Sequence, residues 1–497
     1  MKKEILINSS LVECRVALVE DGLLQEVLIE SSHAETMVGN IYKGTVQRVV
    51  KGLQSAFVSI SDSENAFLPG SDFRTRTAAA GSTEVLDEDI EQSADIEQRI
   101  RPGQELLFQV TKEPIGNKAA RVTTKITLAS RYLVMTPSSA SIRVSVKIED
   151  EIERQRLKDL VTACKGNTSS GFIARTSAVG VSPEDLQRDV GELTVRWQEI
   201  QMRFRSESTG TLLHRDLPAP LRVLRDIVSS DVTGITVDDD QTQSEVQDFI
   251  AAFLPSQLGN LTKVPPGQNL FDRYGLEEQL KAALKSKVSL KSGAYLVIEQ
   301  TEAMTTIDVN TGSYLGTINL AETVLETNLE AATAIPRQLR MRNIGGIIVV
   351  DFIDMETDED KQALLDCLSA GLLKDRAPTR HSNVSTLGLV EIARRRSGKS
   401  LQMLLSQPCS HCYGVGIVDS IDALAAAVFR EVYRRRLEFK NLTCQVLAAQ
   451  ELVDRIYCDY QSEVLDLSSD HAVTMKLKVH ENFSMGDFRL LQQTEVQ

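Results

Sequence analysis

Two aspartates and an asparagine lie at the ends of apolar segments in the second half of the chain, where they could bind a metal ion together. Residues 294–310 predict two strands of a hairpin, and Asp308 and Asn310 are two residues apart in the second strand. Side chains two residues apart in a strand point to the same face. Asp351 ends an unbroken apolar run that predicts a buried strand, and open α/β sheets bind ligands at such ends. We therefore predict that Asp308, Asn310 and Asp351 converge.

This set of oxygen ligands indicates a magnesium site. Mg²⁺ prefers hard oxygen ligands, and it commonly binds one or two carboxylates, several waters and a substrate phosphate. A water bound to such an ion becomes a nucleophile near neutral pH, and the ion stabilises charge on the attacked phosphate. Taken singly, each aspartate is more often structural, capping a turn or pairing with an arginine. An acid directly after a buried β-branched run is costly to leave unpaired, which favours a functional role for Asp351.

Basic residues near these carboxylates could hold the phosphates of a nucleic acid. Residues 321–346 predict a helix that carries Arg337 and Arg340 toward the same strand ends. Pro336 inside this helix removes a backbone hydrogen bond and can kink the helix. A second basic run covers residues 394–399. Arginine binds phosphate in bidentate fashion, although a run of charges is more often a solvated face.

The elements that must position these residues indicate a mixed α/β chain with several domains. With 497 residues, the chain is long enough for about three domains of roughly 150 residues each. Alternating apolar residues predict strands over 4–30, and short apolar runs between Gly, Asp and Ser predict a small β-barrel over about 39–128. Residues 140–205 change to helical periodicity, and 215–285 and 286–400 alternate strands with helices.

The helix signals are strongest after Ser182. Ser182 is a suitable N-cap, Pro183 fits the first turn, and two acids follow at the positive end of the helix dipole. The apolar residues of this helix recur on one stripe, which predicts that it packs on a core. They are Leu186, Val190, Leu193, Trp197 and Ile200.

Composition limits the function classes. A formal charge of −14 argues against coating nucleic acid by bulk electrostatics, so any contact with a nucleic acid must be local. The acidic stretch 83–97 predicts a solvated loop. No apolar run reaches about eighteen residues and the start lacks a signal-peptide pattern, so we expect the chain to stay in the cytosol, without a transmembrane segment. Seven scattered cysteines do not indicate a disulfide framework.

Cys409 and Cys412 have the spacing of half a zinc site. A closed structural zinc site needs four ligands, so another chain would have to supply the rest, although His411 is a further possible ligand. A single pair of cysteines at this spacing is about equally compatible with zinc binding and with another structural or redox role.

Three segments closely resemble the catalytic segment of the ribonuclease E/G family: EAMTTIDVNTG (302–312), TNLEAATAIPRQLRMRNIGGIIVVDFIDM (327–355) and LGLVEIARRR (387–396). The resemblance is most specific over about 290–416 and extends more thinly over nearly the whole chain. It implies a magnesium-dependent endoribonuclease that cleaves single-stranded, A/U-rich RNA to 5′-phosphate and 3′-hydroxyl ends, in rRNA processing and mRNA decay. By its length, the chain is closer to the ribonuclease G branch.

The resemblance also implies roles for individual residues. Asp308 and Asp351 match the magnesium-binding aspartates, Asn310 matches the asparagine that assists them, and Arg394 falls at a phosphate-contacting arginine. The other matched residues bind RNA or zinc: Phe57 and Phe67 contact bases, Lys118 is a neighbouring basic residue, Arg175 and Thr176 bind a 5′-monophosphate, and Cys409 and Cys412 share a zinc ion between protomers of a homodimer or homotetramer. Two positions depart from the family pattern, Ala119 in place of a glycine and Ser410 in place of a proline.

The fold implied by the resemblance is an α/β multidomain chain with an inserted β-barrel. Its expected parts are an RNase H-like subdomain (1–38 and 215–285), an OB-fold RNA-binding barrel (39–128), a 5′-monophosphate sensor subdomain (129–214), a DNase I-like catalytic subdomain (286–400), a zinc-link (401–418) and a small C-terminal domain (419–497).

Two alternatives remain open at this point. A catalytically inactive RNA-binding protein would use only the barrel and the phosphate pocket, which the presence of Asp308, Asn310 and Asp351 makes less favourable. A metal-dependent nuclease for single-stranded DNA would use the same carboxylates, because such a site does not distinguish the sugar.

Overall fold

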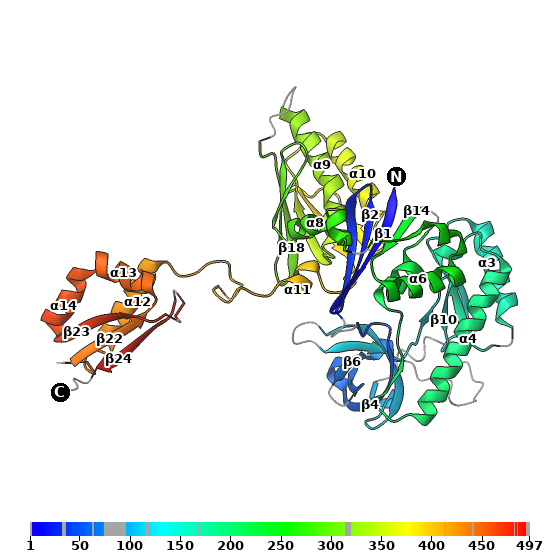
Figure 1. The fold of residues 1–497 in the computed structure, drawn as a ribbon, viewed down its shortest axis with the longest axis horizontal. Coiled ribbons are helices and arrows are strands. Elements are labelled where there is room, and N and C mark those ends of the chain that lie inside the picture. Colours follow the sequence, from blue (N-terminus) through cyan, green and yellow to red (C-terminus); the bar gives the residue numbers. More distant parts are fainter. Residues whose placement is uncertain are drawn as a thin grey trace. The chain divides into compact units, whose positions relative to one another are not determined.

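A computed structural model of the chain describes most of its residues, and it divides into two compact units, Met1–Leu404 and Leu405–Gln497 (Figure 1). Most of the acidic stretch predicted as a loop lies outside the described residues, and so does Lys118. The described residues are 2–31, 36–61, 64–73, 96–114, 119–166, 168–229, 231–265, 267–313, 320–412, 414–439, 442–481, 483–484 and 486–493.

The first sheet joins both ends of a long stretch of chain. Its strand order is β15-β14-β1-β2-β3. Strands β1, β2 and β3 form an antiparallel meander. Strand β14 pairs in parallel with β1, and β15 pairs in parallel with β14. One face packs on α5 and α6 and the other on α7 and α8. The elements are β1 (Lys3–Ser9), β2 (Glu13–Glu20), β3 (Leu23–Ser31), α5 (Ala219–Asp226), β14 (Val232–Val237), α6 (Asp240–Phe253), β15 (Leu261–Lys263), α7 (Leu270–Arg273) and α8 (Leu276–Ala283).

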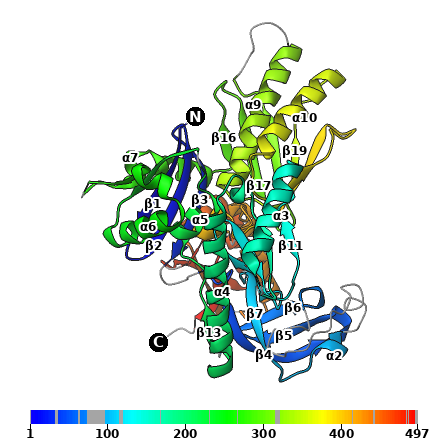
Figure 2. The same cartoon turned by 90° about the vertical axis from the view of Figure 1, so that its right-hand side faces the viewer.

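The second sheet closes into the small barrel that the short apolar runs predict. Five strands follow one another in the order β4-β5-β6-β8-β7, and β7 pairs back to β4. The architecture is consistent with an OB-like fold. Gly44 on β4 faces a crowded interior, since a Cβ there would lie 2.4 Å from the Ser59 carbonyl oxygen. Figure 2 labels four of these strands, β4, β5, β6 and β7, in one part of the unit. The barrel strands are β4 (Ile41–Val50), β5 (Ser55–Ser59), β6 (Asn65–Pro69), β7 (Glu105–Lys112) and β8 (Ala120–Thr123), with β13 (Leu212–His214) added to β4.

A four-stranded sheet with two helices follows the barrel, in the order β11-β12-β10-β9. Its long helix α4 begins after Ser182, whose side chain accepts a hydrogen bond from the Asp185 N–H group, as the sequence predicts. The predicted apolar stripe of α4 is buried in the core beneath this sheet. The elements are β9 (Leu128–Ala129), β10 (Leu133–Thr136), β11 (Ile142–Val144), α3 (Glu151–Lys165), β12 (Gly171–Ala174) and α4 (Pro183–Ser206).

The last sheet of the first unit has six strands in the order β16-β17-β18-β19-β21-β20. Helices α9 and α10 lie side by side and pack on one of its faces (Figure 1). Helix α9 continues through Pro336, whose ring lies so close to Gly371 on α10 that a Cβ there would be 2.7 Å from it. The elements are β16 (Lys287–Ser289), β17 (Tyr295–Gln300), β18 (Met304–Asn310), α9 (Leu320–Met341), β19 (Gly346–Asp351), α10 (Asp358–Leu372), β20 (Thr379–His381), β21 (Leu389–Arg394) and α11 (Leu401–Leu405).

The second unit has a three-stranded sheet in the order β23-β22-β24, and its core contains residues of three helices. Among the helices that the structure describes in the whole chain, none is both long enough and apolar enough to cross a membrane. The elements of this unit are α12 (Ile421–Arg434), β22 (Leu442–Ala448), α13 (Gln450–Asp459), α14 (Gln461–His471), β23 (Val473–Val479) and β24 (Phe488–Gln493).

Candidate functional site

The two aspartates singled out from the sequence lie directly beside each other. β18 and β19 are parallel neighbours, and the register pairs Asp308 with Asp351. Residues paired in this way share a face, and neighbouring strands lie about 4.8 Å apart. In β18 the residues alternate between exposed and buried, so Asp308 shares the exposed face with Thr306, and Ile307 and Val309 enter the core.

Asn310 completes this group from the next position on the same face. Its Nδ2 atom donates a hydrogen bond of 2.8 Å to Oδ2 of Asp308. Both aspartates are exposed, so their carboxylate oxygens are accessible from solvent. The structure therefore brings together Asp308, Asn310 and Asp351.

The donor set fits a hard divalent cation. Like charges directly opposite each other on neighbouring strands repel, and a bound cation would relieve that repulsion. Within the described part of the chain, no group of three or more His, Cys, Asp or Glu side chains could hold a metal ion. Two carboxylates with water and substrate phosphate as the other ligands are typical of Mg²⁺.

The sheet face around the carboxylates is open, which differs from the buried strand that the apolar run predicts. Met304 and Ile347 lie opposite each other on this face and are 39% and 55% exposed. Strand β19 is therefore buried on one face only. An extended substrate can therefore lie across the carboxylates on this open face.

Arg394 is not part of this group, and the expectation that it contacts a substrate phosphate there is corrected. It pairs with Gly346, whereas Asp351, five residues farther along β19, pairs with Leu389. At about 3.3 Å per residue, that separates the two ends by roughly 16 Å. Arg394 is also only 6% exposed.

The buried Arg394 side chain is held by protein partners. Its Nε donates to Oδ2 of Asp375 at 2.6 Å, and its Nη1 donates to the Ile344 carbonyl oxygen at 2.8 Å. The burial of Arg394 could have been predicted from its position in β21, because it lies two and four residues after the buried Ile392 and Val390 and so on the same face of the strand. Parity places its side chain on the face opposite the carboxylates.

Arg337 and Arg340 are likewise directed away from the strand ends. Arg337 donates to the Leu24 carbonyl oxygen and to Gln279, both at 3.0 Å. Arg340 donates two hydrogen bonds, of 3.0 and 2.8 Å, to Glu26. These arginines therefore attach α9 to β3 and α8, which corrects the prediction that they hold phosphates.

The barrel carries two aromatic rings on its outside. Phe57 on β5 and Phe67 on β6 are cross-strand partners, and their ring centroids lie 5.8 Å apart with an edge-to-face arrangement. Phe57 is 36% exposed, and Phe67 is partly exposed. Their neighbours along both strands are buried in the barrel. The pair is therefore available to a ligand.

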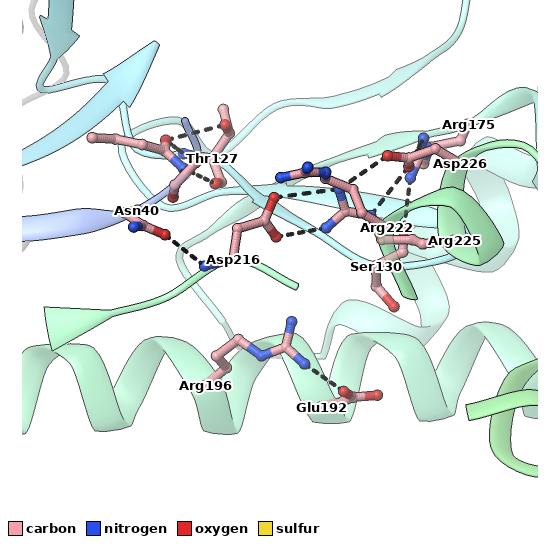
Figure 3. Close-up of polar contacts among 12 residues, drawn as sticks. Asn40, Thr127, Ser130, Arg175, Glu192, Arg196, Asp216, Arg222, Arg225 and Asp226 are labelled. Carbon is pink, nitrogen blue, oxygen red and sulfur yellow. Dashed lines mark hydrogen bonds and ion pairs between the residues drawn. The ribbon is translucent and has the colours of Figure 1, made fainter. Parts of the chain in front are cut away.

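Arg175 lies in a cluster of arginines and aspartates at the end of β12 (Figure 3). Its Nη1 donates to the Ser130 carbonyl oxygen at 2.8 Å and its Nη2 to Oδ1 of Asp226 at 2.6 Å. Asp226 also accepts two hydrogen bonds from Arg225, whose Nη1 donates to Asp216 at 2.8 Å. Burial raises the pKa of Asp226, but the hydrogen bonds from Arg225 and Arg175 outweigh it and hold that pKa below its usual value.

Thr176 follows Arg175 at the start of a short 3₁₀ turn, and its side chain is exposed. Arg131 lies behind the same cluster, where its Nη1 donates to the Arg225 carbonyl oxygen at 2.8 Å. Burial lowers the pKa of Arg131. The positive charges of several arginines thus lie close together here, and Asp226 is the anion that Arg175 contacts.

In the second unit, Cys409 is exposed and Cys412 is partly exposed. Hydrogen bonds from the backbone N–H groups of Cys412 and His411 lower the pKa of the Cys409 thiol, which favours the thiolate that binds metal. Gly414 and Gly416 follow with φ angles of +86° and +82°, values that favour glycine. The turn therefore presents two thiols of the predicted half-site.

Comparisons with known proteins show the family of the chain. The sequence profile of the Ribonuclease E/G family matches residues 127–397, more than half of the chain. The chain is 42% identical over 435 residues to Ribonuclease G of Salmonella typhimurium, covering 87% of this chain and 88% of that protein. It is 41% identical to Ribonuclease G of Escherichia coli (strain K12), with the same coverage. Against Ribonuclease E of Nostoc sp. it is 36% identical over 407 residues, covering 80% of this chain and 57% of that protein. This chain therefore belongs to the ribonuclease E/G family.

Proposed function

We propose that this chain is a magnesium-dependent endoribonuclease that cleaves single-stranded RNA to 5′-phosphate and 3′-hydroxyl ends. The observation that carries the proposal is the in-register pair of Asp308 and Asp351 on an open sheet face. The names of the relatives, Ribonuclease G and Ribonuclease E, support RNA as the substrate. A preference for A/U-rich RNA and roles in rRNA processing and mRNA decay are part of the proposal by family resemblance.

The residues of the site divide the reaction between them. Asp308 and Asp351 would hold Mg²⁺, which supplies an activated water and positive charge beside the phosphate when bound. Asn310 fixes the orientation of the Asp308 carboxylate through its 2.8 Å hydrogen bond. The open face would position the phosphodiester. In hydrolysis, the attacking water would release a proton as its oxygen bonds to phosphorus, the bond from phosphorus to the 3′ oxygen would break, and the 3′ oxygen would take up a proton in turn.

The experiment that tests this function compares one sequence offered as single-stranded RNA and as DNA, with Mg²⁺ and with a chelator. Internal cleavage of RNA that needs Mg²⁺ and leaves 5′-phosphate ends is expected. Equal cleavage of DNA would favour the nuclease without sugar preference. Binding without cleavage of either would favour the inactive RNA-binding protein.

Phe57 and Phe67 are proposed to stack on unpaired bases of the RNA. Because stacking of one base on one aromatic ring contributes about 1–3 kcal/mol, Phe57→Ala and Phe67→Ala are each expected to weaken single-stranded RNA binding roughly 5- to 150-fold. The measurement is fluorescence anisotropy with a labelled RNA in a chelator, so that no cleavage occurs. Leu53→Ala is the control, since Leu53 is a 67% exposed apolar side chain on the same barrel. Parent-like affinity of both Phe variants would exclude the stacking role.

Arg175 and Thr176 are proposed to bind the 5′-monophosphate end of the RNA, where the phosphate would compete with Asp226 for Arg175. Arg175→Ala is expected to lower cleavage of 5′-monophosphorylated RNA about tenfold or more, since a hydrogen bond to a charged group contributes about 1.5–3 kcal/mol. Cleavage of 5′-hydroxyl RNA should change less than about twofold. Arg143→Ala, an exposed change on the neighbouring strand β11, is the control. Equal losses with both substrates would contradict the proposed pocket.

Zinc is proposed as a structural ion shared between two protomers. Cys409 and Cys412 of one chain supply two thiolates, and the same residues of a partner would complete a tetrahedral site. This implies a homodimer, or a homotetramer built from two such pairs.

A further inference from the structure

Lys287 is a cation on the same sheet face as the carboxylates, and no sequence motif points to it. Lys287 on β16 pairs with Val297 on β17, Val297 pairs with Asp308, and Asp308 pairs with Asp351. Cross-strand partners share a face, so these residues form one row across four strands of the sheet. At about 4.8 Å per strand, the backbone of Lys287 lies roughly 10 Å from that of Asp308.

The side chain of Lys287 is held by an aromatic ring. Its Nζ atom lies 3.7 Å from the ring centroid of Tyr295, close enough for a cation–π interaction. Tyr295 is the cross-strand partner of Asn310. The ammonium of Lys287 therefore lies toward the row that contains Tyr295 and Asn310, although its backbone is in the row of Asp308.

The surroundings of Tyr295 also constrain this arrangement. Gly312, just beyond Asn310, has a φ of +59°, and a Cβ there would lie 3.1 Å from the Tyr295 ring and 2.6 Å from the Gly293 carbonyl oxygen. The two loops thus pass close to the ring because Gly312 has no side chain. The ring in turn supports an exposed lysine.

The charge balance of this face shows why a cation is needed there. Asp308, Asp351, Glu299 and Glu391 are all exposed on it, and this negative charge repels the phosphates of a nucleic acid. Arg394 pairs with Asp375 and Arg340 with Glu26, so neither offsets it. Arg380 is exposed on this face, but it lies on the edge strand β20, at the opposite side of the sheet from Lys287 on β16. Within the described residues, the Lys287 ammonium contacts the ring of Tyr295.

We propose that Lys287, supported by Tyr295, binds a backbone phosphate one or two linkages from the scissile bond. The proposal rests on the proposed function, because it takes the Asp308–Asp351 pair as the place of cleavage. Because the ammonium is held over the Tyr295 ring, two strands from Asp308, it is placed to neutralise a phosphate that neighbours the scissile one. Lys287 would then determine how the strand is aligned on the sheet.

The first test measures RNA affinity against salt concentration in the presence of a chelator. Each phosphate contact adds about 0.7 to the slope of log affinity against log salt for a single strand. Lys287→Ala is expected to lower this slope by about that amount and to weaken binding several-fold. Lys287→Arg should restore the slope, and Tyr295→Leu should lower affinity without changing the net charge. Lys281→Ala, an exposed lysine on α8, is the control with the same charge change.

The second test locates the phosphate. A series of RNA strands, each with one neutral methylphosphonate linkage, is expected to reveal one linkage whose neutralisation weakens binding to the parent but not to Lys287→Ala. An unchanged slope in Lys287→Ala, or equal penalties for parent and variant at every linkage, would overturn the proposal. Absence of cleavage by the parent in Mg²⁺ would instead contradict the proposed function, since both binding tests are done without cleavage.

Discussion

Asp308→Asn and Asp351→Asn should each lower the rate of RNA cleavage by about 1000-fold or more while leaving RNA binding nearly intact. The two carboxylates are in register on adjacent strands, so removing either charge takes away half of the proposed metal site. A bound ion contributes several kcal/mol to the reaction, and each 1.36 kcal/mol is a factor of ten in rate. Single-turnover cleavage of a 5′-monophosphorylated A/U-rich RNA measures the loss, and anisotropy in a chelator measures binding.

Glu299→Gln is the matched control for this pair of variants. Glu299 is exposed on β17 and pairs with Thr306, so it lies on the same face one row away from the aspartates. Glu299→Gln replaces an acid by its amide, as Asp308→Asn and Asp351→Asn do. A similar loss in Glu299→Gln would mean that the general charge of the face matters and not these two carboxylates. Full activity of Asp308→Asn or Asp351→Asn would place the active site elsewhere.

Arg394→Ala is expected to destabilise the protein by about 3–5 kcal/mol, because it leaves one member of a buried ion pair without its partner. The side chains of Arg394 and Asp375 are 5% and 3% exposed. A lone buried carboxylate loses both its hydration and its counter-ion. Urea unfolding followed by circular dichroism measures the change. The salt dependence of RNA binding should stay that of the parent, which separates this role from a phosphate contact.

Two further variants sharpen this prediction. Arg394→Met combined with Asp375→Asn removes both charges, and it should be more stable than Arg394→Ala because no unpaired charge remains. Arg395→Ala, at the next and exposed position, should change stability by less than about 0.5 kcal/mol. If Arg394→Ala unfolded like the parent and lost RNA affinity with a lower salt slope, the phosphate contact would be restored as its role.

Local patterns were sufficient to predict the features that depend on one strand or helix. The spacing of Asp308 and Asn310 predicts their common face, and the Ser182 cap and the stripe after it predict α4. The barrel follows from short strands with turn residues between them. In each case the residues that decide the outcome are neighbours in the chain, and the periodicities of strand and helix relate them.

The features that could not be predicted depend on partners far away in the chain. Arg337 and Arg340 contact Leu24 and Glu26, more than three hundred positions earlier. A run of arginines carries no information about such partners, so a phosphate role and an ion-pair role look alike in the sequence. Lys287 was missed for the same reason, because its place beside Asp308 depends on the pairing of three strands.

The pairing of β1 with β14 has a consequence for how the chain is made. Lys3 and Val232 are register partners, so the ribosome must add more than two hundred residues before the first sheet can be completed. At roughly 5–20 residues per second this takes on the order of 10–50 s. During that time the β1–β2–β3 meander emerges with the β1 edge that β14 will cover still unpaired, while the barrel and the β9–β12 sheet are synthesised. Until β14 is made, the free edge of β1 is thus open to pairing with strands of other chains.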